Sequence, residues 1–156
     1  MSDEPLTIDE LRERVEEVRV AMVTTADEHG LMSSRPLTVQ RIDERGDVYF
    51  VVGRDAEWAA AGQTMNVALV DEDRTWISVV GGAEYVEGTS LLSDLWDETT
   101  DTFFPDGQDS AVVLQVHAVR WEYWTAPNRL GRMAGRAKAF LMDSRPDLVD
   151  SGSIET

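Results

Sequence analysis

The chain opens with a helical pattern of hydrophobic residues and then changes to strand-like runs. Apolar residues recur at helical spacing near the N-terminus, at Ile8, Leu11, Val15 and Val18. Thr7 and Glu10 match a capping box, so this pattern predicts an amphipathic helix from Thr7 to about Arg19. Beyond it, β-branched and apolar runs alternate with turn signals rich in Asp and Gly, which is typical of antiparallel strands.

These runs predict six strands and a few short helices. The strands are expected at residues 18–26, 31–42, 48–52, 66–70, 75–86 and 111–124. Short helical segments are expected at residues 56–62, 91–96 and 129–142. Gly81 and Gly82 interrupt the fifth strand, which indicates a β-bulge or a close approach of two backbones.

Six strands with short connections favour a mainly β fold that closes into an antiparallel barrel, because closure removes exposed strand edges. A β-sandwich is the alternative. At 156 residues the chain is most simply one domain, which we place at residues 1–143. Residues 144–156 are expected to be an acidic, disordered tail.

The composition narrows the possible functions. A net charge of −16 argues against nucleic acids and anionic membranes as partners. The chain has no cysteine, which excludes disulfides and thiol chemistry, and His29 and His117 lack metal-ligand spacing. No apolar run approaches membrane-spanning length and no secretory signal is evident, so a cytoplasmic location is expected. We find no nucleophile elbow, phosphate loop or dinucleotide fingerprint, and we assign no catalytic residue and no metal ligand.

The segment from Ser33 to Gln40 combines strand-like residues with an arginine and a proline. Pro36 donates no backbone hydrogen bond, so its strand is confined to an edge, an end or a bulge. Arg35 supplies a permanent forked cation beside it, which suits a phosphate. Taken alone, the pair is equally compatible with a surface arginine next to an edge proline.

Several short segments together resemble one family of proteins. They are residues 34–38, 49–50, 54–55, 79–83, 95–96, 104–107 and 122–124. In this order they resemble the general stress protein 26-like branch of the pyridoxamine 5′-phosphate oxidase-like FMN-binding split-barrel family, over residues 18–139. The resemblance implies a six-stranded split β-barrel of Greek-key type. It also implies a homodimer that binds FMN between its subunits and acts on a small molecule.

The resemblance assigns roles to particular residues. Arg35 matches an arginine that holds the FMN phosphate, and Pro36, Leu37 and Thr38 match the backbone segment along the flavin. Gln40 falls near the reactive edge of the ring. Trp124 falls where an aromatic of the second subunit borders the flavin, although a barrel-core tryptophan is an equal alternative.

The chain departs from the family pattern after the third strand. The family's hydroxyls and phosphate-binding lysine are replaced, and the candidate cofactor-binding residues here are Val52, Gly53, Arg54 and Trp58. Each lost charge-assisted hydrogen bond costs about 1.5–3 kcal/mol, although the backbone of Gly53 and the side chain of Arg54 can compensate. The substrate histidine motif of true pyridoxamine phosphate oxidases is also missing after Trp124, so we do not expect that activity. Arg129 and Arg132 then either meet an anion from the partner subunit or are solvated helix charges.

Three functions therefore remain open from the sequence. The first is an FMN-dependent oxidoreductase of general-stress type. The second is a non-enzymatic stress or binding module with a degraded flavin pocket that Trp58 partly fills. The third is a deazaflavin-dependent reductase.

Overall fold

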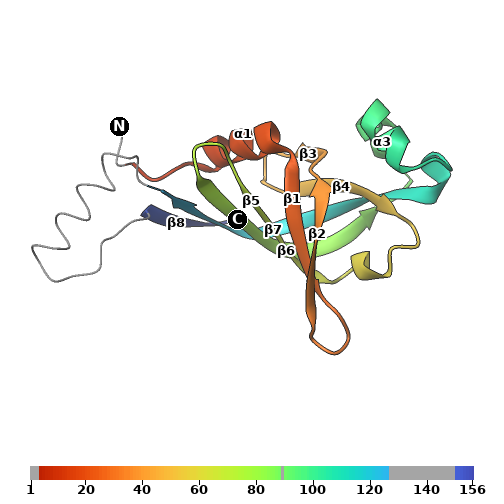
Figure 1. The fold of residues 1–156 in the computed structure, drawn as a ribbon, viewed down its shortest axis with the longest axis horizontal. Coiled ribbons are helices and arrows are strands. Elements are labelled where there is room, and N and C mark those ends of the chain that lie inside the picture. The colour runs from red at the N-terminus through yellow and green to blue at the C-terminus, as the bar shows by residue number, and fades with distance from the viewer. Residues whose placement is uncertain (1–3, 89, 127–149) are drawn as a thin grey trace, which may run out of the picture.

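The computed structural model describes residues 4–88, 90–126 and 150–156 (Figure 1). Its elements are α1 (Ile8–Val18), β1 (Val20–Ala26), β2 (Met32–Thr38), β3 (Arg41–Ile42), β4 (Val48–Gly53), η1 (Glu57–Ala59), β5 (Thr64–Val70), β6 (Thr75–Val86), α2 (Leu91–Leu95), α3 (Glu98–Phe103), η2 (Gln108–Ser110), β7 (Ala111–Thr125) and β8 (Asp150–Glu155). Among the described residues, no helix has both the length and the apolar character needed to cross a membrane. The helix predicted at residues 129–142 lies outside the described part of the chain.

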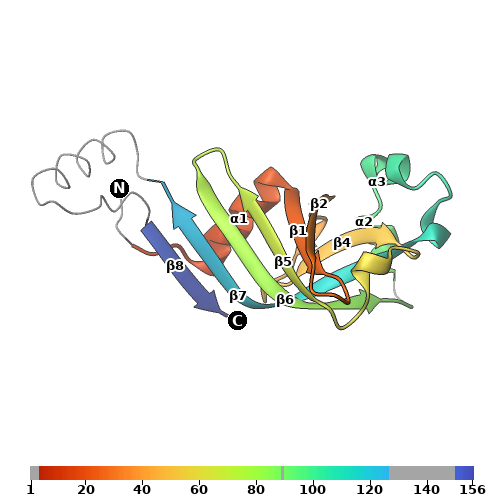
Figure 2. The ribbon, with the colours of Figure 1, turned by 60° about the horizontal axis from the view of Figure 1, so that its bottom comes forward.

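The described strands form one antiparallel sheet in the order β2-β1-β5-β6-β7-β4-β3, with β8 also paired to β7. Figures 1 and 2 show that this sheet curls strongly. Residues 39 and 40 connect β2 at one end of the sheet order to β3 at the other, so the two ends approach each other. The predicted mainly β, antiparallel split barrel is therefore confirmed, with eight strands in place of six.

The core lies on the inner face of the curled sheet. Burial alternates along the strands, as in β5, where Met65, Val67 and Leu69 point inward. Trp121 and Phe50 are the largest fully buried side chains, and the indole N–H of Trp121 donates to the carbonyl oxygen of Gly46 at 3.3 Å. The predicted N-terminal helix is confirmed as α1, whose capping box is formed and whose buried residues belong to this core.

The predicted strand at residues 31–42 is split in two. The backbone N–H of Val39 donates to the carbonyl oxygen of Arg19 at 2.6 Å, and the backbone N–H of Gln40 donates to the carbonyl oxygen of Tyr49 at 2.9 Å. The chain thus leaves its pairing with β1 at Thr38 and pairs with β4 from Arg41 onwards. This switch carries the chain from one end of the sheet order to the other.

Residues 144–156 were expected to be an acidic, disordered tail, but residues 150–155 form strand β8. Residues 144–149 lie outside the described part of the chain. Asp150–Glu155 pair with the C-terminal part of β7. Gly152 lies opposite Tyr123, and a Cβ at this glycine would lie 2.5 Å from the tyrosine ring. The hydroxyl of Tyr123 in turn accepts a hydrogen bond from the N–H of Leu6 at 2.9 Å. β8 is thus part of the sheet, next to the segment that leads into α1.

The β-bulge or close backbone approach expected at Gly81 and Gly82 is present as a bulge in β6. The register between β6 and β7 shifts between Val80 and Gly81. A Cβ at Gly81 would lie 2.1 Å from the carbonyl oxygen of His117, whereas a Cβ at Gly82 would meet no atom within 4 Å. The close approach of two backbones therefore requires glycine at position 81 only.

A charged cluster occupies β7 beside this bulge. His117 Nδ1 lies 3.0 Å from a carboxylate oxygen of buried Asp47, and His117 Nε2 lies 2.8 Å from a carboxylate oxygen of Glu84. Asp47 also accepts hydrogen bonds from the N–H of Ala118 at 2.9 Å and from the amide of Gln115 at 3.0 Å. The hydrogen bond to Glu84 raises the pKa of His117 above its usual value, and the hydrogen bond to Asp47 adds a smaller effect in the same direction.

We expect this cluster to make stability depend on pH. The folded state binds the His117 proton more tightly than the unfolded chain does. The protonated His117 therefore contributes to the free energy of unfolding below about pH 6.5, and this contribution is lost as the pH rises through the folded-state pKa. The ring is half-exposed, so the loss is at most about 1 kcal/mol. Urea unfolding at pH 6 and pH 8 should show this loss in the wild type and a smaller one in His117→Gln. An equal loss in both proteins would contradict the assignment.

Candidate functional site

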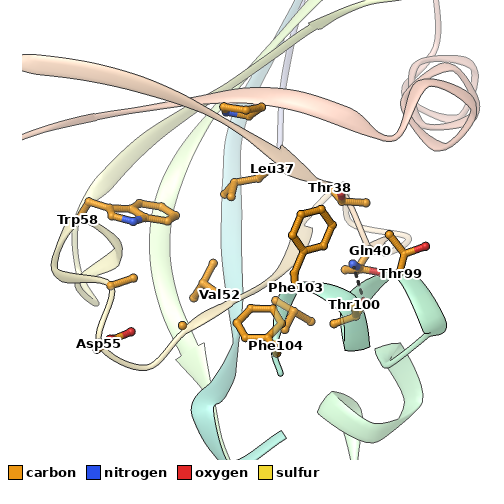
Figure 3. A pocket seen from close by; sticks show the side chains of 14 residues that line it. Leu37, Thr38, Gln40, Val52, Asp55, Trp58, Thr99, Thr100, Phe103 and Phe104 are labelled. Carbon is orange, nitrogen blue, oxygen red and sulfur yellow. Dashed lines mark hydrogen bonds between the residues drawn. The ribbon is translucent and has the colours of Figure 1, made fainter. Parts of the chain in front are cut away.

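A cavity of about 500 Å³ lies between β2, β4, η1 and α3 (Figure 3). Its volume is in the range of small-molecule sites. The residues that line it are Pro36, Leu37, Thr38, Gln40, Val51, Val52, Gly53, Asp55, Ala56, Trp58, Thr99, Thr100, Phe103 and Phe104.

One wall of the cavity is the backbone of an edge strand. β2 is the first strand in the sheet order, so one side of it has no partner strand among the described residues. Pro36 pairs with Met22 and Leu37 with Ala21, both on β1. The proline therefore lies on an edge strand, as its missing N–H requires. The free side of an edge strand is the kind of surface that can offer backbone N–H and C=O groups to a ligand.

Aromatic side chains form two opposing walls. Trp58 of η1 lies on one side in Figure 3, Phe103 and Phe104 lie on the other, and Val52 lies between them. The ring centroid of Phe104 lies 5.7 Å from that of Trp96, so the two aromatic rings contact each other. Phe103 is 71% exposed, more than its apolar ring favours in water. A slot with aromatic walls suits a flat, largely apolar ring system.

A polar chain fixes the corner where α3 meets the β2–β3 connection. The amide of Gln40 donates to the hydroxyl of buried Thr100 at 3.3 Å, drawn as a dashed line in Figure 3. Thr100 donates from its backbone N–H at 2.7 Å and from its hydroxyl at 2.8 Å to the carboxylate of Asp97, the N-cap of α3. The backbone hydrogen bond from Thr100 also lowers the pKa of Asp97. The cap therefore holds both α3 and Gln40 in place.

The charges around the cavity are unevenly distributed. Among the described residues that line it, Asp55 is the only charged one. The guanidinium of Arg35 lies 4.3 Å from the centroid of the Trp58 ring and donates to the hydroxyls of Thr25 and Ser33. Partial burial lowers the pKa of Arg35. Arg35 thus contacts the Trp58 ring as a cation with hydroxyl partners, and it is not among the residues that line the cavity.

Comparison with known proteins identifies the family. A family model described as pyridoxamine 5′-phosphate oxidase like matches residues 7–147. The chain belongs to this family. A comparison with curated proteins gives no significant match.

Solved structures share the pyridoxamine 5′-phosphate oxidase-like fold at low sequence identity. A general-stress-protein-26-type protein from Jannaschia sp. CCS1 is 21% identical with a TM-score of 0.66, covering 92% of this chain and 94% of its own. A general stress FMN/FAD binding protein from Xanthomonas citri is 17% identical with a TM-score of 0.63, covering 75% and 87%. A pyridoxamine 5′-phosphate oxidase-related, FMN binding protein from Nostoc punctiforme PCC 73102 is 11% identical with a TM-score of 0.58, covering 96% and 95%.

The structure brings together most of the residues that the resemblance to the pyridoxamine 5′-phosphate oxidase-like family singled out. Seven of the ten line the cavity: Pro36, Leu37, Thr38, Gln40, Val52, Gly53 and Trp58. Arg35 contacts the Trp58 ring without lining the cavity. Arg54 points elsewhere and is paired with the carboxylate of Glu87. Trp124 lies near the end of β7 remote from Ala111, where it pairs with Trp76 and Ser151.

Sequence reasoning missed seven of the fourteen cavity residues, including those that α3 supplies. The cavity residues it did not single out are Val51, Asp55, Ala56, Thr99, Thr100, Phe103 and Phe104. One available signal was Asp97 at three residues before Thr100, the spacing of an N-cap and the backbone N–H that it binds. That signal predicts a helix, but it does not show which part of the sheet the helix faces.

Outside the cavity, the outer face of the sheet carries a group of exposed apolar side chains, which we call the outer apolar face. These are Val20 and Met22 of β1, Val70 of β5, Trp76 of β6 and Trp124 of β7. Val70, Trp76 and Trp124 are cross-strand neighbours in one row. Trp76 is 41% and Trp124 is 38% exposed, so two large aromatic rings meet solvent side by side. A contiguous patch of this kind is typical of an interaction surface.

Proposed function

We propose that this protein binds a flavin, with FMN as the expected form, and uses it as an oxidoreductase acting on a small molecule. The observation that carries the proposal is the 500 Å³ slot between Trp58 and the Phe103–Phe104 wall, bordered by the edge-strand residues 36–38. An isoalloxazine ring is flat, with apolar faces and one polar edge, so the slot and the strand suit its two kinds of surface. The related structures from Xanthomonas citri and Nostoc punctiforme are described as FMN/FAD binding and FMN binding proteins, which supports the same assignment.

The residues of the cavity divide the work of binding. Trp58, Phe103 and Phe104 provide apolar contact and exclude water from the ring. The backbone of residues 36–38 and the Gln40 side chain are proposed to hydrogen-bond its polar edge, and Arg35, which contacts the Trp58 ring, is the cation proposed for a phosphate. When bound, the flavin supplies hydride or electron transfer between a reductant and an acceptor.

The same proposal includes a homodimer. A second copy that covers the outer apolar face removes Trp76, Trp124, Val70 and Met22 from water, which is a favourable change. Since Trp124 of one chain lies far along β7 from its own cavity, any contact with a bound flavin is expected to come from the partner's Trp124. Light scattering is expected to give twice the mass of the 17.4 kDa chain.

A flavin titration tests the proposal directly. We expect FMN fluorescence to change saturably at micromolar concentration, and the purified protein to oxidise NAD(P)H once it is loaded. A deazaflavin added in a parallel titration distinguishes the third function left open by the sequence. Absence of saturable binding of FMN, riboflavin and the deazaflavin at high micromolar concentration would refute a flavin site.

A second candidate function is a non-enzymatic binding module with a degraded pocket. It is favoured by the Asp55 carboxylate in the cavity wall and by the pairing of Arg54 with Glu87, because both disfavour a phosphate. This candidate predicts a colourless protein without NAD(P)H turnover. Yellow protein as purified, with turnover, would exclude it.

A further inference from the structure

A second hollow of about 310 Å³ adjoins the flavin cavity. It is lined by Glu16, Arg19, Val39, Gln40 and Arg41, from the end of α1 and the β2–β3 connection. Gln40 lines both spaces. Gln40 is therefore a wall common to the two spaces.

The backbone at Arg19 is strained at this hollow. Arg19 has a φ of 63° and a ψ of −31°, in the region that favours glycine. Helices commonly end with glycine in such a conformation, because a Cβ is unfavourable there. Here the position carries a long cationic side chain, and its backbone is fixed by hydrogen bonds to Val15 and Val39. The residue with this strained backbone thus lines the hollow with a cationic side chain.

The two arginines of the hollow lack close carboxylate partners. Arg19 lies 3.9 Å from a carboxylate oxygen of Asp97, with both side chains about half-exposed. Among the described residues, no carboxylate lies within ion-pair distance of Arg41, whose guanidinium is 6.0 Å from the Tyr49 ring. By contrast, Arg12, Arg14 and Arg54 each have a carboxylate at hydrogen-bond distance. Arg35, Arg45 and Arg74 also have no carboxylate within ion-pair distance among the described residues, but none of them lines either hollow.

We propose that Arg19 and Arg41 bind the carboxylate of a small-molecule substrate whose reacting part reaches the flavin cavity past Gln40. Each guanidinium offers forked donors that match a carboxylate. Glu16 lies on the same wall and opposes further negative charge, so a monoanion is favoured over a phosphate dianion. The role as a substrate subsite rests on the proposed flavin function, whereas anion binding itself does not.

The test uses flavin-free protein in chloride-free buffer, with benzoate, its neutral analogue benzamide and inorganic phosphate as probes. Wild-type protein is expected to bind benzoate in the millimolar range, at least tenfold more tightly than either other probe. Arg19→Gly is expected to weaken benzoate binding at least tenfold and to raise the unfolding midpoint, because glycine relieves the backbone strain while the charge is lost.

Arg74 provides a matched control, since it has the same φ of 63° and lies outside both hollows. Arg74→Gly is expected to raise the midpoint as well while leaving benzoate affinity within twofold of the wild type. Arg41→Gln, at an exposed position of β3, is expected to repeat the tenfold loss without changing the backbone at Arg19.

The outcomes separate this inference from the proposed function. Equal binding of benzoate and benzamide, or unchanged benzoate affinity in both Arg19→Gly and Arg41→Gln, would overturn the subsite. If benzoate binding depends on both arginines but no flavin binds, the anion site stands and the flavin function fails. If flavin binds to wild type and Arg19→Gly alike while benzoate binding is lost in the variant, both proposals are supported.

Discussion

Replacing Gly81 by alanine is expected to abolish stable folding, whereas the same change at Gly82 is expected to leave stability nearly unchanged. A Cβ at Gly81 would lie 2.1 Å from the backbone oxygen of His117, inside β7. β7 pairs with β4, β6 and β8, so it cannot move away without disturbing most of the sheet. Overpacking against a fixed backbone of this kind is expected to cost at least about 3 kcal/mol.

The matched control is the neighbouring residue of the same strand. A Cβ at Gly82 meets no atom within 4 Å, so Gly82→Ala is expected to change the free energy of unfolding by no more than about 0.5 kcal/mol. Circular dichroism and urea unfolding of the two variants provide the comparison. Equal stability of the two would mean that the β6 bulge does not bring the backbones this close.

The largest expected effect on binding follows from filling the proposed flavin cavity. Ala56 lines it next to Trp58, so Ala56→Phe places a second aromatic ring where the flavin ring is expected. We expect flavin affinity to fall about 100-fold, which corresponds to about 2.7 kcal/mol. Fluorescence titration with FMN measures the loss, and an unchanged unfolding midpoint shows that the fold is intact.

Ala60 offers the corresponding control, because it is exposed at the end of η1 and does not line the cavity. Ala60→Phe is therefore expected to keep wild-type affinity. If Ala56→Phe also bound FMN normally, the flavin would have to lie outside the slot between Trp58 and the Phe103–Phe104 wall.

Local patterns predicted those parts of the fold that local physics determines. The capping box at Thr7, the edge position of Pro36 and the bulge at Gly81 each follow from the chemistry of one or a few neighbouring residues. The positions of the predicted strands follow from the alternation of buried and exposed residues, as in β4 and β5.

The features that were missed depend on contacts between distant segments. β8 consists mostly of Asp, Ser, Gly and Glu, which are poor strand formers, and it is ordered by pairing with β7. The placement of α3 over the cavity depends on Gln40 and Thr100, which are 60 residues apart. The pairing of Arg54 with Glu87 redirects a cation that the sequence alone offered to a phosphate.

The tyrosine that joins β8 to the chain's opening segment has a practical consequence. Tyr123 contacts Gly152 across the sheet and accepts the N–H of Leu6, so both segments are held at one pole of the molecule. Figures 1 and 2 show α3 and η1, which wall the cavity, at the opposite pole. An affinity tag or fluorophore joined before Leu6 is thus directed away from the cavity mouth, which leaves diffusing ligands an open approach to an immobilised sample.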